Sequence, residues 1–178
     1  MALVIMTGAS GSGKTAIAEA IAVNEPSIIV FRFDSIGVPS SEVMATFGEG
    51  DQPGGAWQRA MTFKWMERIA PTIAADKAVL FEGQMRISFI HDALSASGIE
   101  NARILCVDCD DATRSKRLTH DRLQPELVND SVMSWSRFLC KEALETGCDI
   151  LDTSNMSLAE SVGAVLSIFK HPDRKSVV

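Results

Sequence analysis

Short apolar runs alternate along the chain with longer stretches in which apolar positions recur at every third or fourth residue. The short runs are typical of strands buried in a sheet, and the periodic stretches are typical of amphipathic helices. We expect strands at residues 2–6, 27–33, 78–81, 103–107 and 149–151. We expect helices at residues 14–23, 57–69, 86–97, 111–120, 131–146 and 157–169. This alternation predicts an α/β domain whose parallel sheet is covered by helices.

Several helix ends are marked by the residues found there. Ser157 with Glu160 forms an S-x-x-E capping box at the start of the last expected helix. Gly98 and Gly147 occupy positions typical of glycines that close a helix at its carboxyl end. Pro71 should end or kink its helix, because proline lacks the amide proton that a helix interior requires.

One expected helix carries a stripe of large apolar side chains. Trp57, Met61, Trp65 and Ile69 recur at every fourth position and therefore share one helix face. We expect this face to pack in the core or to form the wall of a substrate pocket, and an interface with another chain is the alternative. The sequence does not determine an oligomeric state.

Composition narrows the class of protein. The chain has 178 residues, of which 46% are hydrophobic and 22% charged, as is typical of one soluble globular domain spanning residues 1–178. A chain of this length builds a core without disulfides or metal ions. Its only C-x-x-C pair, Cys106 and Cys109, is interpreted as two ordinary strand cysteines. Residues 170–178 are expected to form a frayed tail.

Charge and hydropathy disfavour two kinds of partner. The chain has 17 Lys and Arg against 23 Asp and Glu, and this net charge of −6 disfavours a broad surface for nucleic acid. No apolar run approaches the roughly 18 residues of a membrane-spanning helix, and the first residues are typical of a strand rather than of a leader. We therefore expect a cytoplasmic protein without nucleic-acid or membrane partners, which must bind any anionic ligand locally.

The most specific motif lies between the first expected strand and the first expected helix. The residues are Gly8, Ala9, Ser10, Gly11, Ser12, Gly13, Lys14 and Thr15, a complete G-x-x-x-x-G-K-[ST] Walker A pattern. The glycines allow backbone N–H groups to surround a polyphosphate, and the helix N-terminus adds partial positive charge. Lys14 can reach the β- and γ-phosphates, and Thr15 supplies a hydroxyl ligand for Mg²⁺. A strand-to-helix turn with a chance lysine is the alternative.

With this motif and this order of elements, the chain resembles the P-loop kinases. It is most similar to the small-molecule branch of nucleoside monophosphate kinase-like enzymes, which includes shikimate, gluconate and chloramphenicol phosphotransferases. The resemblance implies a P-loop three-layer α/β/α sandwich with a five-stranded parallel sheet and a helical lid. It places a substrate-binding insertion at residues 37–70 and the lid at residues 111–130. The absence of a guanine-reading Asn-Lys-x-Asp motif favours ATP, with Mg²⁺, as the phosphoryl donor.

Asp34 follows the second expected strand, at the sheet edge where α/β proteins bind ligands. In the kinases that this chain resembles, an acid at this position contacts the acceptor hydroxyl and can deprotonate it. Phosphoryl transfer depends mainly on positioning and charge, so such an acid mostly aligns the nucleophile. An aspartate that caps the following turn is the alternative.

The residues after the third expected strand resemble the Asp-Gly-x-x-Arg segment of nucleoside monophosphate kinases. Here Glu82 replaces the aspartate, Gly83 follows it, and Arg86 completes the pattern. The resemblance implies that Glu82 orients Mg²⁺ or holds Thr15, and that Gly83 lets substrate approach the backbone. Arg86 could bind an anionic substrate or the transferred phosphate, and a surface arginine at a helix start is the alternative.

A cluster of cationic side chains lies in the expected lid of this acidic chain. Arg114 and Arg117 share a helix face, and Arg122 follows within the next turn or loop. The resemblance implies that lid arginines neutralise charge on the transferred phosphate and that one packs on the adenine. A solvated charged helix is the alternative.

These features predict an ATP-dependent phosphotransferase that acts on a small hydroxyl- or phosphate-bearing molecule. A nucleotide-dependent ATPase or switch acting on a protein partner is the alternative, and it would require an exposed apolar partner surface. Phosphorylation of polynucleotide ends is disfavoured by the acidic charge balance. The acceptor itself cannot be identified from the motifs.

Overall fold

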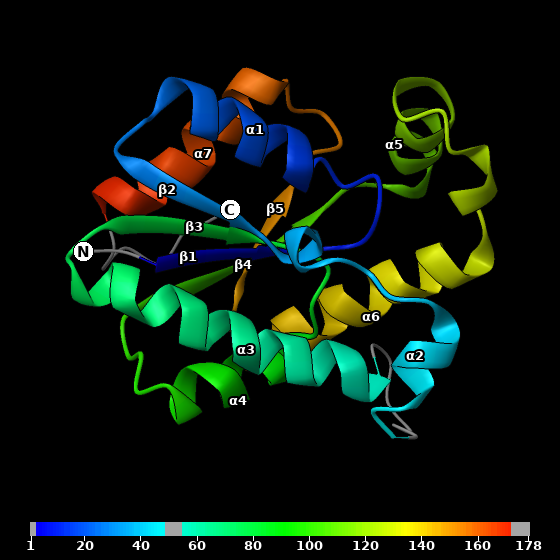
Figure 1. The fold of residues 1–178 in the computed structure, drawn as a ribbon. Helices are drawn as coiled ribbons and strands as arrows, with labels where there is room; N and C mark the ends of the chain where they lie inside the picture. Colours follow the sequence, from blue (N-terminus) through cyan, green and yellow to red (C-terminus); the bar gives the residue numbers. More distant parts are fainter. Residues whose placement is uncertain (1–2, 49–54, 172–178) are drawn as a thin grey trace.

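The computed structural model describes residues 3–48 and 55–171, and a single parallel sheet lies at its centre (Figure 1). The strands are β1 (Leu3–Thr7), β2 (Ile28–Arg32), β3 (Ala78–Glu82), β4 (Ala102–Asp108) and β5 (Asp149–Asp152). They pair in the order β2-β3-β1-β4-β5. Because β1 is the middle strand, the loop that leaves it lies at the centre of the sheet's carboxyl edge.

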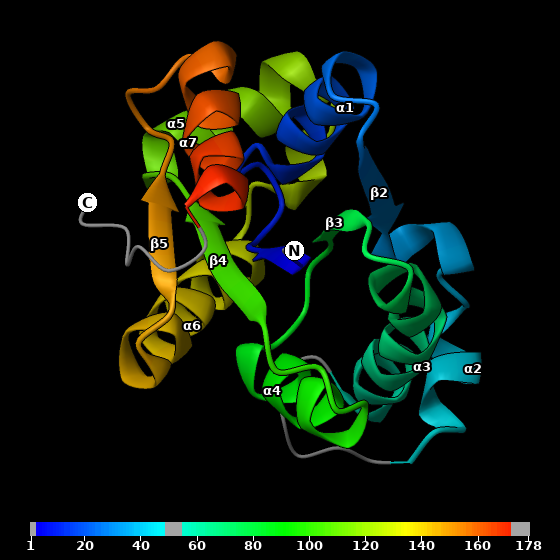
Figure 2. The same cartoon turned by 90° about the vertical axis from the view of Figure 1, so that its left-hand side faces the viewer.

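Helices cover both faces of this sheet, as Figures 1 and 2 show. One face carries α1 (Lys14–Asn24) and α7 (Leu158–Lys170), and the other carries α3 (Gly55–Ala74), α4 (Ile87–Ala96) and α6 (Asp130–Thr146). The short helices α2 (Ser41–Ala45) and α5 (Asp111–Lys116) lie toward the carboxyl edge. The predicted P-loop α/β/α sandwich with a five-stranded parallel sheet is therefore confirmed.

Two hydrophobic clusters lie on the two sides of the sheet. Strand residues such as Val4 and Leu80 pack with Ile17 and Ile21 of α1 on one side. Their neighbours in the sequence point to the opposite side, because side chains alternate along a strand. There they meet the apolar faces of α3, α4 and α6. The strands are buried on both faces and therefore appear in the sequence as continuous apolar runs.

The stripe on α3 belongs mostly to this second cluster. Trp65 and Ile69 are buried, and Trp57 and Met61 pack against the cluster while staying partly exposed. The indole Nε1 of Trp65 donates a hydrogen bond to the carbonyl of Phe33 at 3.1 Å. The stripe is therefore part of the core and also fixes the chain just after β2.

Three details near helix ends match the expectations. Ser157 and Glu160 form the predicted capping box at the start of α7. Gly147 closes α6 with a φ of 68°, and Gly98 lies just beyond the C-cap of α4 with a φ of 64°. Left-handed backbone of this kind favours glycine, which lacks a Cβ.

The structure corrects the expected helices at several places. Helix α3 continues through Pro71 to Ala74, and the amide of Ala75 still donates to the Pro71 carbonyl at 3.1 Å. The helix expected at residues 111–120 consists of α5 followed by a π-helical turn, η2 (Arg117–Asp121). The short helix α2 and the 3₁₀ turn η1 (Phe33–Ile36) were not expected, and a further 3₁₀ turn, η3 (Pro125–Leu127), precedes α6.

Part of the sequence expectations falls outside the described residues. These are residues 172–178 of the expected tail and residues 49–54 of the expected insertion. In the described ranges, none of the helices combines the length and apolar character that crossing a bilayer requires.

Candidate active site

The Walker A segment forms a glycine-rich loop between β1 and α1. Gly8 and Gly13 have φ values of 152° and 100°, which side chains with a Cβ rarely adopt. A Cβ on Gly8 would lie 2.1 Å from the carbonyl oxygen of Val107, so β4 packs directly against the loop backbone. Both glycines are thus required by the loop's conformation and close packing, and the loop leads directly into the N-terminus of α1.

Lys14 is buried at the start of α1 and is only 7% exposed. Its Nζ donates to the carbonyl of Ala9 at 3.1 Å and to the Ser12 hydroxyl at 3.5 Å. Burial lowers the pKa of Lys14 to about 8, although the nearby Glu82 and Asp34 carboxylates favour its charged form. The ammonium group is therefore held inside its own loop, close to two acids.

Asp34 and Glu82 come from neighbouring strand ends beside Lys14. The register pairs Arg32 of β2 with Glu82 of β3, and Asp34 follows within the 3₁₀ turn η1. Asp34 is exposed, whereas Glu82 is buried. Burial raises the pKa of Glu82, Lys14 opposes that shift, and Asp34 adds to it. The two carboxylates thus influence the same lysine.

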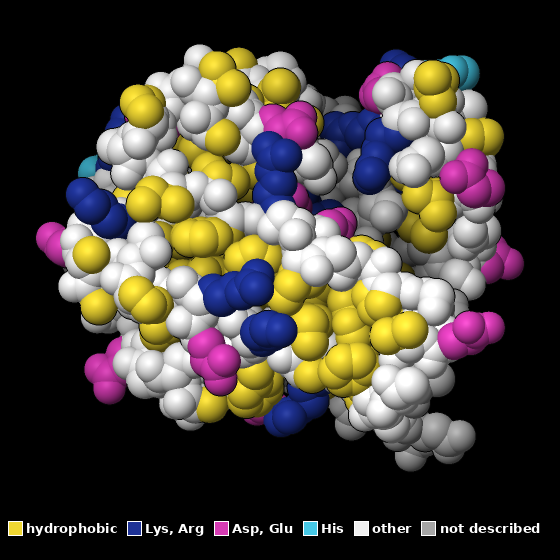
Figure 3. All heavy atoms as spheres, viewed as in Figure 1, with side chains coloured by type: hydrophobic (Ala, Val, Ile, Leu, Met, Phe, Trp, Pro, Cys, Tyr) yellow, Lys and Arg dark blue, Asp and Glu magenta, His cyan; other side chains and the backbone are white. Residues whose placement is uncertain are grey.

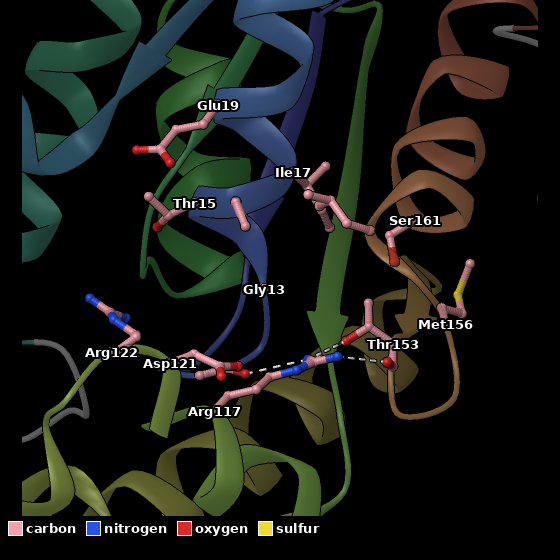
Figure 4. A pocket seen from close by; sticks show the side chains of 13 residues that line it. Gly13, Thr15, Ile17, Glu19, Arg117, Asp121, Arg122, Thr153, Met156 and Ser161 are labelled. Atoms are coloured by element: carbon pink, nitrogen blue, oxygen red, sulfur yellow. Dashed lines mark hydrogen bonds between the residues drawn. The ribbon is translucent and has the colours of Figure 1, made fainter. Parts of the chain in front are cut away.

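A cavity of about 520 Å³ lies on the other side of the loop (Figure 4). It is lined by the loop, α1, the π-helical turn η2 and the segment after β5. Thr15, Glu19 and Arg122 lie on one side of it, and Ile17 and Met156 lie on the other. Both Thr15 and Arg122 are exposed. A cavity that combines polar and apolar walls beside a phosphate loop suits the nucleoside part of a nucleotide.

Arg117 connects η2 to this cavity and to the loop. Its Nη1 donates to the carbonyl of Ser12 at 3.2 Å and to the Thr153 hydroxyl at 2.8 Å, and its Nη2 donates to the Thr153 carbonyl at 2.8 Å. The Thr153 hydroxyl itself donates to the Ser12 carbonyl at 2.9 Å. Figure 4 shows the guanidinium of Arg117 reaching toward Thr153 across the cavity floor. This expected lid arginine is therefore docked on the loop.

Arg114 has a different position from the one expected for a lid arginine. Its side chain is completely buried, and it pairs with the carboxylate of Asp108. It also donates to the Ser10 carbonyl at 2.7 Å and to the Ser136 hydroxyl at 2.8 Å. A lid arginine was expected to face the transferred phosphate, but this guanidinium lies behind the loop and supports its backbone. The reason is that Asp108, at the end of β4, supplies a buried counter-charge.

The Asp108 carboxylate is the counterpart of that buried arginine. Burial acts to raise its pKa, but hydrogen bonds from Cys140 and Ser136, with the charge of Arg114, lower the pKa below the usual value. Cys140 Sγ lies 3.0 Å from Asp108 Oδ2. The charged pair is thus hydrogen-bonded from several elements, as a buried pair requires.

Arg86 and Gly83 follow β3 and are held by contacts within the protein. Arg86 pairs with Glu142 at 3.4 Å, and its guanidinium lies 4.7 Å from the centre of the Phe138 ring. A Cβ on Gly83 would lie 2.4 Å from Cβ of Phe33. Gly83 is therefore needed so that η1 can pack on the end of β3. The guanidinium of Arg86 contacts a carboxylate and an aromatic ring of the protein, and the roles of both residues toward a substrate stay predictions.

Three supporting residues were not singled out from the sequence. Gln58 donates to the Gln84 carbonyl at 2.6 Å and accepts from the Arg86 amide at 3.0 Å. Glu142 accepts from the first amides of α4, at 2.6 Å from Ile87. Thr153 holds the loop as described above. Each acts through contacts with residues distant in the sequence, and no local motif indicates such contacts.

No protein-family model matches this sequence, and no curated protein matches it. Its fold is shared with solved small kinases. A sugar kinase from Janibacter sp. HTCC2649 superposes with a TM-score of 0.65 at 22% identity, over 95% of this chain and 94% of that one. A shikimate kinase from Acinetobacter baumannii, in complex with shikimate, gives 0.61 at 12% identity, over 97% and 95%. A gluconokinase from Sinorhizobium meliloti 1021 gives 0.57 at 16% identity, over 97% and 98%.

Proposed function

We propose that this protein is an ATP-dependent phosphotransferase that moves the γ-phosphoryl group of MgATP to a small hydroxyl- or phosphate-bearing molecule. The observation that carries the proposal is the position of Lys14. It lies in a phosphate-binding loop with a nucleoside-sized cavity on one side and the carboxylates of Asp34 and Glu82 on the other. The kinases with the same fold support this interpretation.

The residues around the loop fit a nucleotide with Mg²⁺. The left-handed glycines leave the loop backbone free of side chains, and the N-terminus of α1 supplies partial positive charge. Thr15 and Glu82 would hold Mg²⁺, which when bound neutralises charge on the phosphate oxygens. Lys14 would release its contacts with Ala9 and Ser12 and bind the transferred phosphoryl group.

The lid would contribute through Arg117 and Arg122. Arg117 keeps η2 against the loop, and Arg122 is exposed and close enough to lower the pKa of Lys14 electrostatically. Cations placed where negative charge develops stabilise the transition state most when water is excluded. Asp34 would accept a hydrogen bond from the acceptor hydroxyl and align it for attack.

The direct test measures ADP release with MgATP, alone and with pools of nucleosides, nucleoside monophosphates, sugars, hydroxy acids and amino alcohols. Lys14→Ala is the inactive control, and Lys116→Ala, which changes an exposed lysine on α5, is its matched control. We expect one pool to raise ADP release in the wild type and in Lys116→Ala only. ADP release that is the same without any acceptor would favour the ATPase or switch alternative, and release that survives in Lys14→Ala would disprove both.

A further inference from the structure

The acceptor side of the site has an unusual charge distribution for a protein that must handle phosphates. The described residues between β2 and the first turn of α3, 34–48 and 55–58, contain two acidic residues, Asp34 and Glu42, and no Lys, Arg or His. Both acids are exposed. An anionic acceptor would therefore approach negative rather than positive side chains here.

The arginines that flank this segment already have acidic partners. Arg86 pairs with Glu142, and its side chain is only 12% exposed. Aromatic rings also contact its guanidinium, which lies 5.2 Å from the Phe89 ring centre and 4.7 Å from that of Phe138. If an acceptor drew Arg86 away from Glu142, the nearly buried Glu142 carboxylate would lose much of the positive charge that balances it. This loss costs free energy.

Arg59 and Arg32 are paired as well. Arg59 donates to Asp92 at 2.8 Å, and its guanidinium lies 4.8 Å from the Phe63 ring centre. Arg32 lies 3.5 Å from Glu19 of α1. Both pairs are exposed and hence weak, and Arg32 makes the longer contact, so Arg32 is the side chain that an anionic acceptor would recruit first.

Apolar side chains supply the remaining surface beside this segment. Trp57 packs edge-on against Phe33, with ring centres 5.7 Å apart, and remains partly exposed at the start of α3. Val43 and Phe47, in and after α2, are 48% and 43% exposed. Figure 3 shows hydrophobic side chains gathered over α2 and the first turns of α3, beside the hollow whose wall carries Lys and Arg side chains.

We infer that the acceptor is a hydroxyl compound without a carboxylate or phosphate group, either uncharged or carrying an amine. This inference rests on the proposed function and narrows its acceptor class. In the transfer, the acceptor oxygen forms a bond to the γ-phosphorus while the bond from that phosphorus to the β–γ bridging oxygen breaks. ADP leaves with the electron pair, and the hydroxyl proton passes to Asp34 and then to solvent.

The test compares acceptors in pairs that share a scaffold and differ in the charged group. Suitable pairs are glucose with gluconate, a nucleoside with its 5′-monophosphate, and an amino alcohol with the corresponding hydroxy acid. The readout is ADP release that depends on Lys14. In every pair that reacts, we expect the member without the acid to have a kcat/KM at least about tenfold higher.

The variant Arg32→Gln tests whether the acceptor lacks an acid group, as inferred, or whether it carries one that Arg32 binds. We expect it to leave the preference within each pair unchanged. Preference for the anionic member in the wild type, lost in Arg32→Gln, would overturn the inference while the kinase function stands. If no pair gives ADP release that depends on Lys14, the proposed function fails, and the inference fails with it.

Discussion

Arg114 shows that the contacts of a buried side chain can differ from those that its sequence position predicts. An arginine in the expected lid of this acidic chain was predicted to lie at a phosphate, yet Arg114 contacts the Ser10 carbonyl, Asp108 and Ser136. These groups belong to the loop, β4 and α6. Spacing along the sequence indicates the neighbours of Arg114 on its own helix, but it does not show that a carboxylate from another element lies behind it.

Replacing Arg114 should destabilise the fold. Arg114→Met leaves Asp108 without its charged partner, and breaking one side of a buried pair typically costs about 3–5 kcal/mol. Arg137→Met is the matched control, because Arg137 is exposed and its contact with Asp111 is 3.4 Å long. Urea unfolding should show a large loss for the first variant and a loss below about 1 kcal/mol for the second. Equal losses would contradict a supporting role for Arg114.

Lys14 should make nucleotide binding depend on pH. Its pKa is lowered from 10.5 to about 8, so the folded protein loses this charge as the pH rises through 8. We expect ADP affinity to fall toward that of Lys14→Met between about pH 7.5 and about pH 9.5, as measured by calorimetry. The variant should show little change. A wild-type affinity that stays constant over this range would contradict the lowered pKa.

The lowered pKa of Lys14 has the opposite effect on stability, which should rise with pH while nucleotide affinity falls. Between pH 8 and 10.5 the unfolded chain still holds the Lys14 proton, whereas the folded protein has released it. Stability therefore rises with pH wherever the unfolded state binds more protons. Without nucleotide, the free energy of unfolding of the wild type should increase relative to Lys14→Met over this range in urea titrations.

At the scale of elements, the strands and long helices could be predicted because each one buries a regular apolar pattern. Both predicted ends of β4 and the predicted carboxyl end of β1 differ from the observed ones by only one residue, and the predicted start of β1 lies outside the described residues. The short elements η1, α2 and η2 could not be predicted in the same way. Their conformations depend on contacts such as Trp65 with the Phe33 carbonyl, which join residues far apart in the sequence.

The contact between β3 and η1 gives a test of how Asp34 is positioned. In Gly83→Ala the new Cβ would lie 2.4 Å from Phe33, so η1 must shift, and overpacking of this kind costs about 1–3 kcal/mol. Gly163→Ala is the matched control, because a Cβ on Gly163 in α7 meets nothing within 4 Å. The control should gain about 0.5–1 kcal/mol from improved helix propensity.

Kinetics would extend this test to the site itself. Because the shift of η1 moves Asp34, Gly83→Ala should lower kcat more than it lowers ADP affinity, since the proposed nucleotide cavity lies on the other side of the loop. Gly163→Ala should change neither. An unchanged kcat in a destabilised Gly83→Ala would show that the position of η1 is unimportant for transfer.

At the scale of the molecule, the two parts of the proposed site are built by helices from opposite sides of the sheet. The cavity proposed for the nucleotide involves α1, α7 and η2, while the proposed acceptor side is built by η1, α2 and α3. One local motif was enough to predict the donor half of this proposed site. The acceptor half could not be predicted, because its character depends on which arginines are paired, as Arg86 is with Glu142.

A nucleotide that binds in the cavity beside the loop should raise the stability of the folded protein. Ligand at one hundred times its dissociation constant raises the free energy of unfolding by about 2.7 kcal/mol if it binds only the folded state. MgADP should therefore raise the melting temperature of the wild type. It should have little effect on Lys14→Ala, measured by differential scanning fluorimetry. Equal shifts in the two proteins would place the nucleotide elsewhere.

The partners of the Walker A loop also have a consequence for the order in which the protein is made. The loop at residues 8–15 is among the first parts of the chain to be synthesised, but Arg114, Arg117 and Thr153, which hold its carbonyl groups, are made much later. At about 5–20 residues per second, many seconds of translation separate them. A nascent chain that has not yet reached Thr153 thus carries the complete motif without the contacts that support it. If the proposed function holds, the supported form of the ATP site exists only near the end of translation.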